Sequence, residues 1–294
     1  MPFDCFQETP IQTLGQFLDL VTPTEIDPNS GRRRDYSVYR GDSDATRPLL
    51  TSLDKLGGLS PPHTKAHLEE HILRNFIRYS RPYLQQPYAN DWELLIIAQH
   101  HGLPTRLLDW TYSPLVAANF ATLGSNVKGD RVIWKLNWKQ LHEHFNLRPI
   151  AFLVQDLDRV LNEKGISSPW DLFNAPRTDE TAFACMLEPP ALDARIVAQS
   201  ATFTLCSDKT KSFDQILCDH GLQSALRRFV IPANKVDLIR DQLDLCAIDE
   251  RRLFPDLDGV AAEMRRYYSS SARFESWDTE AASDGSCAKP EDTI

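Results

Sequence analysis

Residues 98–121 constrain the fold of this chain more than any other stretch, because many types of polar side chain stand there between two apolar helical patterns. A helix is expected over residues 91–99, with Asn90 or Asp91 as its N-cap and apolar residues on one face. A second helix is expected after Ser113, a good N-cap, with a proline in the first turn, where a missing N–H costs nothing. A polar segment fixed at both ends by buried helices can hold chemical groups in a set geometry.

The same segment also has a purely structural interpretation. Gly102 suits the left-handed position that follows a helix, and His100 and His101 before it favour the negative end of the helix dipole. Arg106 and Asp109 can form a structural ion pair. Buried polar groups are mostly satisfied partners rather than catalysts. The density of different polar residues in so short a span nevertheless favours a functional site.

Length and charge exclude several classes of protein. At 294 residues the chain fits one large domain or two smaller ones. Its formal net charge of −9 argues against a generally basic surface that coats phosphates, although it leaves room for a local basic cleft. No run of residues approaches the length needed to cross a bilayer. The N-terminus lacks a basic region followed by an apolar run, so no signal peptide is expected.

The cysteines and histidines predict neither a disulfide framework nor a metal site. No two cysteines form a CxxC pair, and they are spread over Cys5, Cys185, Cys206, Cys218, Cys246 and Cys287. We therefore expect reduced thiols in a cytoplasmic protein. His142 and His144 are isolated from other metal-ligating residues, and no metal is expected to bind there.

Hydrophobic periodicity indicates four main strands and about six helices. The strands are expected near 36–40, 131–136, 201–206 and 226–231. Because they do not alternate regularly with helices, the pattern predicts an α+β fold in which a small mixed or antiparallel sheet is covered by helices. The Ser, Asp, Gly and Glu content of residues 269–294 predicts a disordered C-terminal tail.

Three groups of residues resemble the FRG domain family, which is named for its Phe-Arg-Gly motif. They are Tyr39-Arg40-Gly41, in which Tyr replaces the Phe; the stretch Gln-His-His-Gly-Leu-Pro-Thr-Arg-Leu-Leu-Asp-Trp-Thr at 99–111; and Arg195 with Gln199 and Phe203. The turn at residues 253–259 is similar to the usual end of such domains. The resemblance covers about residues 14–268 and implies a single domain within residues 1–268.

A weaker resemblance, to ADP-ribosyltransferases of the bacterial toxin class, implies more chemistry. Residues 39–43 look like their first motif, whose Arg holds the NAD phosphates or orders the site. Residues 109–113, followed by small helical residues, are similar to their second motif. Their third motif supplies a catalytic Glu that stabilises an oxocarbenium-like transition state, and Gln199 occupies the comparable place here. The resemblance implies an ADP-ribosyltransferase-like fold with NAD as co-substrate.

Gln199, in place of the catalytic Glu of the transferases, changes the chemistry that is expected at the ribose. A Gln side chain can hold a ribose hydroxyl but supplies no negative charge. Another carboxylate would have to supply it, and Asp109, Glu188 and Glu250 are the candidates. If Gln199 does hold the place of the Glu, the substitution Gln199→Glu is expected to retain or raise the release of nicotinamide.

Physical chemistry supports an NAD site independently of the resemblance. Cleavage of the nicotinamide–ribose bond needs a cleft that orients the dinucleotide, a cation for the pyrophosphate and a negative or polar group near the ribose. Arg40 and Arg106 can bind phosphate in a bidentate manner, and Trp110 and Tyr112 offer faces for stacking. The sequence has no GxGxxG or Walker motif, so neither a Rossmann nor a P-loop site is expected.

These arguments select two overlapping sets of site residues. NAD is expected to contact Tyr39, Arg40, Arg106, Trp110, Thr111 and Ser113. Catalytic roles are expected for Arg40, His101, Asp109 and Gln199. We expect one cleft to bring together Arg40, His101, Arg106, Asp109 and Gln199, which are far apart in the sequence.

Three functions are compatible with this set. The first is an NAD-consuming transferase that modifies a protein, nucleic-acid or small-molecule acceptor, and by analogy it could serve as a toxin or an anti-phage effector. The second is a hydrolase or nuclease that uses His100 or His101 as a general base, with Asp109 orienting it. The third is a non-catalytic module that binds a nucleotide or a partner through the same cleft.

Overall fold

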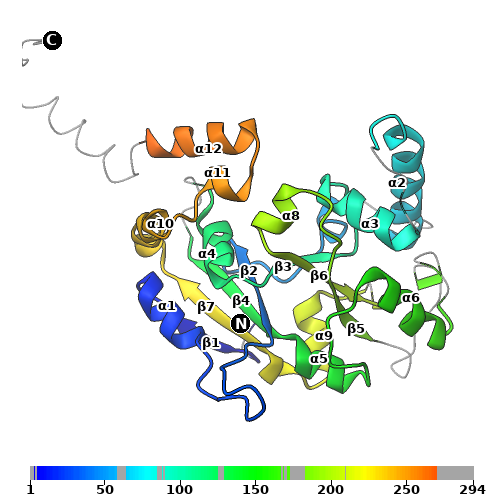
Figure 1. Ribbon diagram of the computed structural model, residues 1–294, viewed down its shortest axis with the longest axis horizontal. Helices are drawn as coiled ribbons and strands as arrows, with labels where there is room; N and C mark the ends of the chain where they lie inside the picture. Colours follow the sequence, from blue (N-terminus) through cyan, green and yellow to red (C-terminus); the bar gives the residue numbers. More distant parts are fainter. Residues whose placement is uncertain are drawn as a thin grey trace, which may run out of the picture.

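The computed structural model describes residues 3, 5–57, 64–84, 88, 90–124, 129–166, 168, 171–172, 183–208 and 210–269. Within these residues seven strands form one sheet in the order β1-β7-β4-β2-β3-β6-β5 (Figure 1). The strands are β1 (Gln7–Pro10), β2 (Ser37–Asp42), β3 (Leu108–Thr111), β4 (Arg131–Asn137), β5 (Ala184–Leu187), β6 (Ala201–Cys206) and β7 (Leu226–Ile231). Only β1 and β7 pair in parallel, and every other pair of neighbours is antiparallel. The protein is therefore α+β with a mixed sheet, as predicted, and the sheet has more strands than expected.

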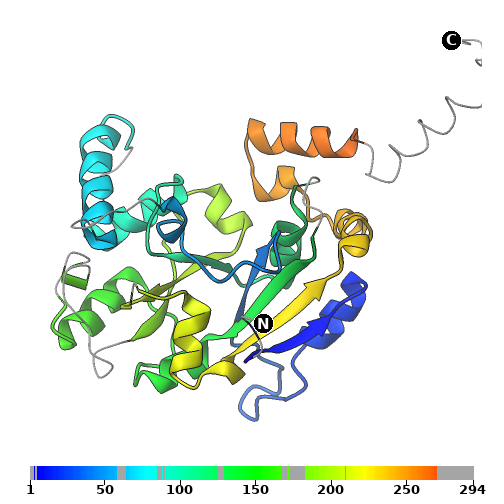
Figure 2. The same ribbon diagram turned by 180° about the vertical axis from the view of Figure 1, so that it is seen from behind.

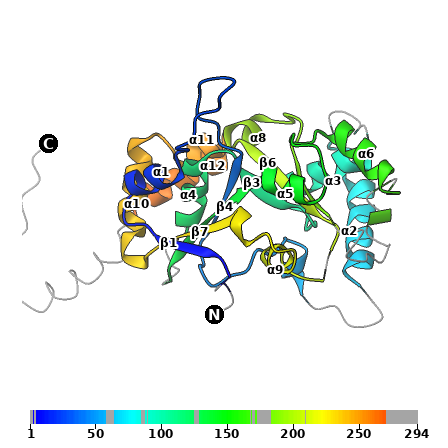
Figure 3. The same cartoon turned by 90° about the horizontal axis from the view of Figure 1, so that it is seen from below.

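Helices surround this sheet on both faces. They are α1 (Leu14–Val21), α2 (Lys65–Ser80), α3 (Asp91–His100), α4 (Pro114–Thr122), α5 (Trp138–His144), α6 (Val154–Glu163), α8 (Ala194–Ala198), α9 (Phe213–Asp219), α10 (Val236–Leu245), α11 (Glu250–Leu253) and α12 (Leu257–Tyr267). Short 3-10 helices occupy Asp54–Leu56, Gln223–Ala225 and Ala233–Lys235. Figure 3 shows α1 and α10 at one end of the molecule and α2 and α6 at the other, and the view from behind agrees (Figure 2).

The sheet is divided into two halves that are joined at one point. Six residue pairs connect β2 to β4, and four connect β3 to β6. Among the described residues a single pair, Tyr39 with Thr111, connects β2 to β3. Beyond that pair the two central strands separate, so backbone groups at the split must find partners other than the ladder.

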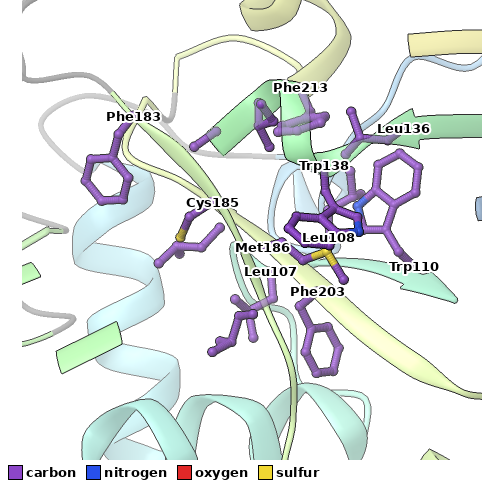
Figure 4. Packing of buried hydrophobic residues seen from close by; sticks show 14 of the residues in the cluster. Leu107, Leu108, Trp110, Leu136, Trp138, Phe183, Cys185, Met186, Phe203 and Phe213 are labelled. Atoms are coloured by element: carbon purple, nitrogen blue, oxygen red, sulfur yellow. The ribbon is translucent and has the colours of Figure 1, made fainter. Parts of the chain in front are cut away.

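The buried apolar side chains form two hydrophobic clusters, and β2, β4 and β7 contribute to both. The smaller cluster joins α1, α4 and α10 to β2, β4 and β7, and Phe17 and Phe229 lie at its centre. The larger cluster fills the space around β3, β5 and β6 and extends under β4 (Figure 4). Trp110 belongs to it: its indole contacts Phe213 edge-on, and its Nε1 donates to Oγ1 of Thr204 at 2.9 Å.

Local sequence signals predicted most of these elements. The strands expected at 201–206 and 226–231 have those bounds in β6 and β7. The strands expected near 36–40 and 131–136 are β2 and β4, whose bounds differ by one or two residues. Three strands, β1, β3 and β5, lie outside the four main strands expected, and each is four residues long. β1 contains a proline at the edge of the sheet, and β3 carries an exposed Asp.

The ends of the two helices that enclose the central segment confirm the predicted caps. Asn90 accepts from the amide of Glu93 at the start of α3, and Ser113 accepts from the amide of Val116 at the start of α4. Gly102 follows α3 with a φ of 81°, which only glycine adopts without strain. Its amide bonds to the carbonyl of Gln99 at 2.9 Å, and the next amide bonds to that of Ala98, as in a Schellman motif.

One prediction about the cysteines is wrong. Cys5 and Cys218 form a disulfide that attaches the residues before β1 to α9. Cys185, Cys206 and Cys246 are free thiols, and Cys287 lies outside the described residues. The tail predicted at 269–294 also lies outside them from residue 270 onward. No helix in the described part of the chain is long and apolar enough to span a membrane.

Candidate functional site

A pocket of about 830 Å³ opens where β2 and β3 separate. Its walls come from β2, β3 and β6, from the C-terminal end of α3, from α8 and from the turn before α12. This volume is typical of small-molecule and cofactor sites. Of the five residues expected to converge on one cleft, the pocket brings together four: Arg40, His101, Asp109 and Gln199. Arg106 does not line it.

Arg40 bridges the split between the two halves of the sheet. Its Nη1 donates to the backbone carbonyl of Asp109 at 2.7 Å and lies 3.6 Å from Oδ2 of the same residue. The Arg40 side chain is 15% exposed, whereas that of Asp109 is 56% exposed. The guanidinium thus satisfies a carbonyl at the split and still borders the pocket with donors that a ligand can reach.

Gly41 explains why the residue after Arg40 must be small. A Cβ atom at this position would overlap with the carbonyl oxygen of Ala117 and the amide nitrogen of Ala121 on α4. The backbone of β2 therefore lies directly against α4, whose small residues allow the close approach. This close packing fixes the position of β2 relative to α4 and therefore the position of Arg40 at the pocket.

Asp109 is held by a chain of polar groups that begins inside the protein. Gln99, on the last turn of α3, donates from Nε2 to Oδ1 of Asp109 at 2.8 Å. The Oε1 of Gln99 accepts from the hydroxyl of Thr105 at 2.6 Å and from that of Ser52 at 3.4 Å. With its amide fixed at both ends, Gln99 orients the carboxylate. Gln99 is not among the predicted site residues, although an amide on a buried helical face, four residues after Leu95, is a usable signal.

Gln199 lies at the junction between α8 and β6. Its Nε2 donates to the carbonyl of Leu253 at 3.0 Å, and its own carbonyl accepts from the hydroxyl of Thr111 at 2.7 Å. Its Oε1 makes no hydrogen bond to the part of the chain that the structure describes. The side chain therefore offers an acceptor, and no charge, at the pocket.

His100 and Asp193 form a pair that the sequence did not reveal. His100 is the last residue of α3, and its Nε2 contacts Oδ2 of Asp193, the N-cap of α8. Burial lowers the pKa of His100 below its ordinary value, although Asp193 acts in the opposite direction. His101 follows, exposed, with its ring 5.3 Å from that of His100. The hypothesis that Asp109 orients a histidine is wrong, because the contacts of its carboxylate are with Gln99 and Arg40.

Arg195 is a second cation at the pocket. Its guanidinium lies over the ring of Phe254 at 4.9 Å from the ring centre, and its Nε is buried without a hydrogen-bond partner in the described structure. Phe120, which also lines the pocket, contacts Phe254 edge-on. Arg195 belongs to the residues that resemble the FRG family, but it is not among the residues predicted for the site.

Arg106 was expected to bind phosphate, and the structure places it elsewhere. Its Nε and Nη2 donate to Oε2 of Glu69 on α2 at 2.8 and 2.6 Å, and its amide donates to Oε1 at 2.9 Å. Both side chains are almost completely buried, with exposures of 4% and 0%. The pair connects α2 to the segment before β3, so Arg106 has a structural role.

Of the other expected NAD contacts, Tyr39, Trp110 and Thr111 line the pocket, and Ser113 does not. The ring of Tyr39 packs in the smaller core, against Phe17, and its hydroxyl donates to a carboxylate oxygen of Asp35 at 2.5 Å. Trp110 is 3% exposed and packs in the larger core. Ser113 caps α4, and the hydroxyl of Thr111 donates to the carbonyl of Gln199, so both hydroxyls have partners within the protein.

Among the three candidate carboxylates, only Asp109 lines the pocket. Glu188 accepts from the hydroxyl of Tyr112, which therefore also has a partner within the protein. Glu250 is buried between Arg240 and Arg266. No group of three or more His, Cys, Asp or Glu side chains in the described ranges is arranged to hold a metal ion.

Comparison with protein families agrees with the resemblance seen in the sequence. Residues 35–129 match the family model of the FRG domain. This segment of the chain is similar to the FRG domain. The match includes β2, α3, β3 and α4, and with them the residues at the split of the sheet; α8 and β6 follow it in the sequence. Comparison with curated proteins and with solved structures gave no match.

Proposed function

We propose that the pocket binds NAD and that this protein is an NAD-consuming transferase with an ADP-ribosyltransferase-like fold. The observation that carries the proposal is the adjacency of three strands. β2, β3 and β6 are consecutive neighbours in the sheet, and the three segments that resemble the transferase motifs lie on them or at their ends. All three segments border one pocket at the split between β2 and β3.

The cations of the pocket suit a pyrophosphate. Arg40 has donors directed to the split, and Arg195 has a buried Nε without a partner among the described residues. A guanidinium forms bidentate, charge-assisted hydrogen bonds with phosphate oxygens. Arg195 takes the role expected of Arg106, and Phe120 and Trp110 supply apolar walls, whereas Tyr112 does not line the pocket.

The opposite charge, needed at the ribose, comes from Asp109. When the bond between ribose C1′ and the nicotinamide nitrogen breaks, its electron pair moves to nicotinamide and positive charge develops on the ribose. A carboxylate fixed in advance stabilises that charge without reorganising during the reaction. Gln99 fixes Asp109 at 2.8 Å, and the Oε1 of Gln199 can accept a hydrogen bond from a ribose hydroxyl.

Release of nicotinamide tests this proposal. The purified protein is incubated with NAD, with and without a cell lysate as a source of acceptors, and free nicotinamide is measured by chromatography. Arg40→Ala is expected to lower release about tenfold or more, because loss of a charge-assisted contact costs about 1.5–3 kcal/mol. The matched control is Arg159→Ala, which removes an exposed arginine of α6 and should leave release unchanged. A protein that neither binds NAD nor releases nicotinamide would contradict the proposal.

The two alternative functions predict different results in the same assay. Saturable binding of NAD without turnover would favour a non-catalytic nucleotide-binding module. A hydrolase or nuclease is favoured by one observation, the His100–Asp193 pair, and cleavage of a phosphodiester without NAD would support it. A role as a toxin or anti-phage effector stays a prediction based on analogy, and the lysate arm of the assay identifies the protein or nucleic-acid acceptor.

A further inference from the structure

The His100–Asp193 pair stands apart from the groups that the proposed NAD reaction uses. Asp109 and Arg40 lie on β3 and β2 at the split, whereas His100 ends α3 and Asp193 begins α8. Both members of the pair nevertheless line the same pocket. Asp193 is itself held in place, because its Oδ1 accepts from the amide of Ile196 at 2.9 Å as the N-cap of α8.

The contact between the two residues determines which ring nitrogen can accept a proton. A carboxylate that contacts Nε2 favours the tautomer with the hydrogen on Nε2, which leaves the lone pair on Nδ1. Nδ1 of His100 makes no hydrogen bond to the described residues, and it is not among their buried atoms without a partner. His100 thus has the arrangement of a general base that a carboxylate orients.

Ionisable groups at the start of α8 and in the next residue of the chain affect the protonation of His100. On α8, Asp193 raises its pKa and Arg195 lowers it, and His101 next to it in the sequence also lowers it. Burial lowers it more than any of these groups, so the pKa falls below the ordinary 6.5 and the ring is neutral at pH 7. Burial by itself raises the pKa of Asp193, but the amide of Ile196 and His100 outweigh this, and the pKa is lowered.

We propose, on the basis of the proposed NAD reaction, that His100 accepts the proton of the group that attacks the ribose. This attacking group, which accepts the ADP-ribose, is a hydroxyl or a water molecule. Asp193 is the positioning residue. The acceptor oxygen forms a bond to ribose C1′ as nicotinamide leaves with its electron pair. The proton of the hydroxyl moves to Nδ1 of His100, and Asp193 stabilises the resulting imidazolium.

This chemistry limits the class of acceptor. A carboxylate or a phosphate oxygen carries no proton at neutral pH and needs no base. An arginine side chain holds its proton too strongly for a neutral imidazole to remove it. A neutral hydroxyl, from a side chain, a ribose or water, becomes a good nucleophile only as its proton is taken, so it benefits from the base.

The test compares rate and pH dependence in three variants. His100→Gln is expected to lower nicotinamide release about 10²–10⁴-fold, as the loss of a general base does, and to change NAD affinity much less. Asp193→Asn should shift the acidic limb of the pH–rate profile to lower pH, because the carboxylate raises the pKa of His100. His71→Gln, an exposed histidine on α2, is the matched control and should keep the wild-type rate and profile.

Nuclear magnetic resonance of the imidazole nitrogens provides a readout that does not need NAD turnover. We expect the hydrogen on Nε2 of His100 in the wild type and a mixture of tautomers in Asp193→Asn. A hydrogen on Nδ1 would overturn the role of His100 whatever the activity. An active wild type with an equally active His100→Gln variant would overturn this inference alone, whereas a wild type that does not use NAD would overturn the proposed function and the inference with it.

Discussion

Two arginine–carboxylate pairs near β3, Arg106 with Glu69 and Arg40 with Asp109, show how a closed ion pair differs from an open one. Arg106 and Glu69 are buried to 4% and 0% exposure, and two carboxylate oxygens receive three hydrogen bonds from one residue. Arg40 and Asp109 are 15% and 56% exposed, and their charged groups lie 3.6 Å apart at a pocket. The hydrogen bonds of the closed pair stabilise the fold. The open pair has donors and acceptors that a ligand can reach.

The largest effect on stability is expected from breaking the closed pair. Arg106→Met leaves the carboxylate of Glu69 buried without its cation, and such a loss costs about 3–5 kcal/mol. The free energy of unfolding is measured by urea denaturation. The double variant Arg106→Met with Glu69→Leu should recover most of the loss, because an apolar pair of similar volume no longer buries a charge. A single variant that loses less than about 1 kcal/mol would remove the contrast with the open pair.

The open pair should behave in the opposite way. Arg40→Ala removes a partly exposed contact to the carbonyl of Asp109, so we expect the free energy of unfolding to fall by no more than about 1 kcal/mol. NAD affinity, measured by titration calorimetry, should fall by about 1.5–3 kcal/mol because the ligand loses a charged partner. If Arg40→Ala unfolded as readily as Arg106→Met, Arg40 would be a structural residue as well.

The same contrast explains what the sequence could and could not predict. The caps at Asn90 and Ser113 and the glycine turn at Gly102 depend on neighbours within a few residues, and all three were predicted. The partner of Arg106 was not. Glu69 stands 37 residues earlier, beside Glu70 on a helix, and nothing local shows that one of the two is buried.

The missed site residues share that cause. Asp193 reads as an ordinary N-cap until α8 is placed against the end of α3. Arg195 reads as a surface residue until its guanidinium is found over Phe254. The split of the sheet could not be predicted either, because β3 has only four residues and an exposed Asp109 in its middle. Polar residues were correctly selected by type and density; their partners needed the tertiary structure.

Gln199→Glu is expected to have an effect of intermediate size on the free energy of unfolding. The contacts of Gln199 also change the expectation for nicotinamide release. One carboxylate oxygen would face the carbonyl of Leu253, to which the amide now donates at 3.0 Å. Losing that bond and opposing two acceptors should lower the free energy of unfolding by about 1–3 kcal/mol. Because Asp109 already supplies charge at the pocket, we expect no gain in nicotinamide release. Gln199→Met loses the hydrogen bond without adding a charge, so it separates the two effects. A Gln199→Glu variant that is stable and releases nicotinamide faster would support the expectation drawn from the sequence, that Glu at this position retains or raises the release.

The smallest expected effect comes from a comparison of two histidines. We call His142 closed, because both of its ring nitrogens bind backbone groups, and His100 open, because one of its ring nitrogens is left at the pocket. His142 is completely buried: Nδ1 donates to the carbonyl of Arg148 at 2.8 Å, and Nε2 accepts from the amide of Met186 at 2.8 Å. Burial lowers its pKa below the ordinary value, since a second ring proton would face an amide donor. His100 has one ring nitrogen committed and one left at the pocket. Protonation of His142 should therefore appear in stability, and protonation of His100 in activity.

The sign of the stability effect follows from proton binding. The pKa of His142 is lower in the folded protein than in the unfolded chain, so the unfolded chain binds more protons as the pH falls below 6.5. Its contribution is fully present above pH 6.5 and is lost toward the folded-state pKa, at no more than about 1.4 kcal/mol per pH unit. Urea denaturation at pH 7.5 and 5.5 should show a smaller decrease for His142→Gln than for the wild type, with His71→Gln as the exposed control. Equal pH dependence in all three proteins would mean that His142 does not titrate in this range, and the closed and open histidines would then differ in packing alone.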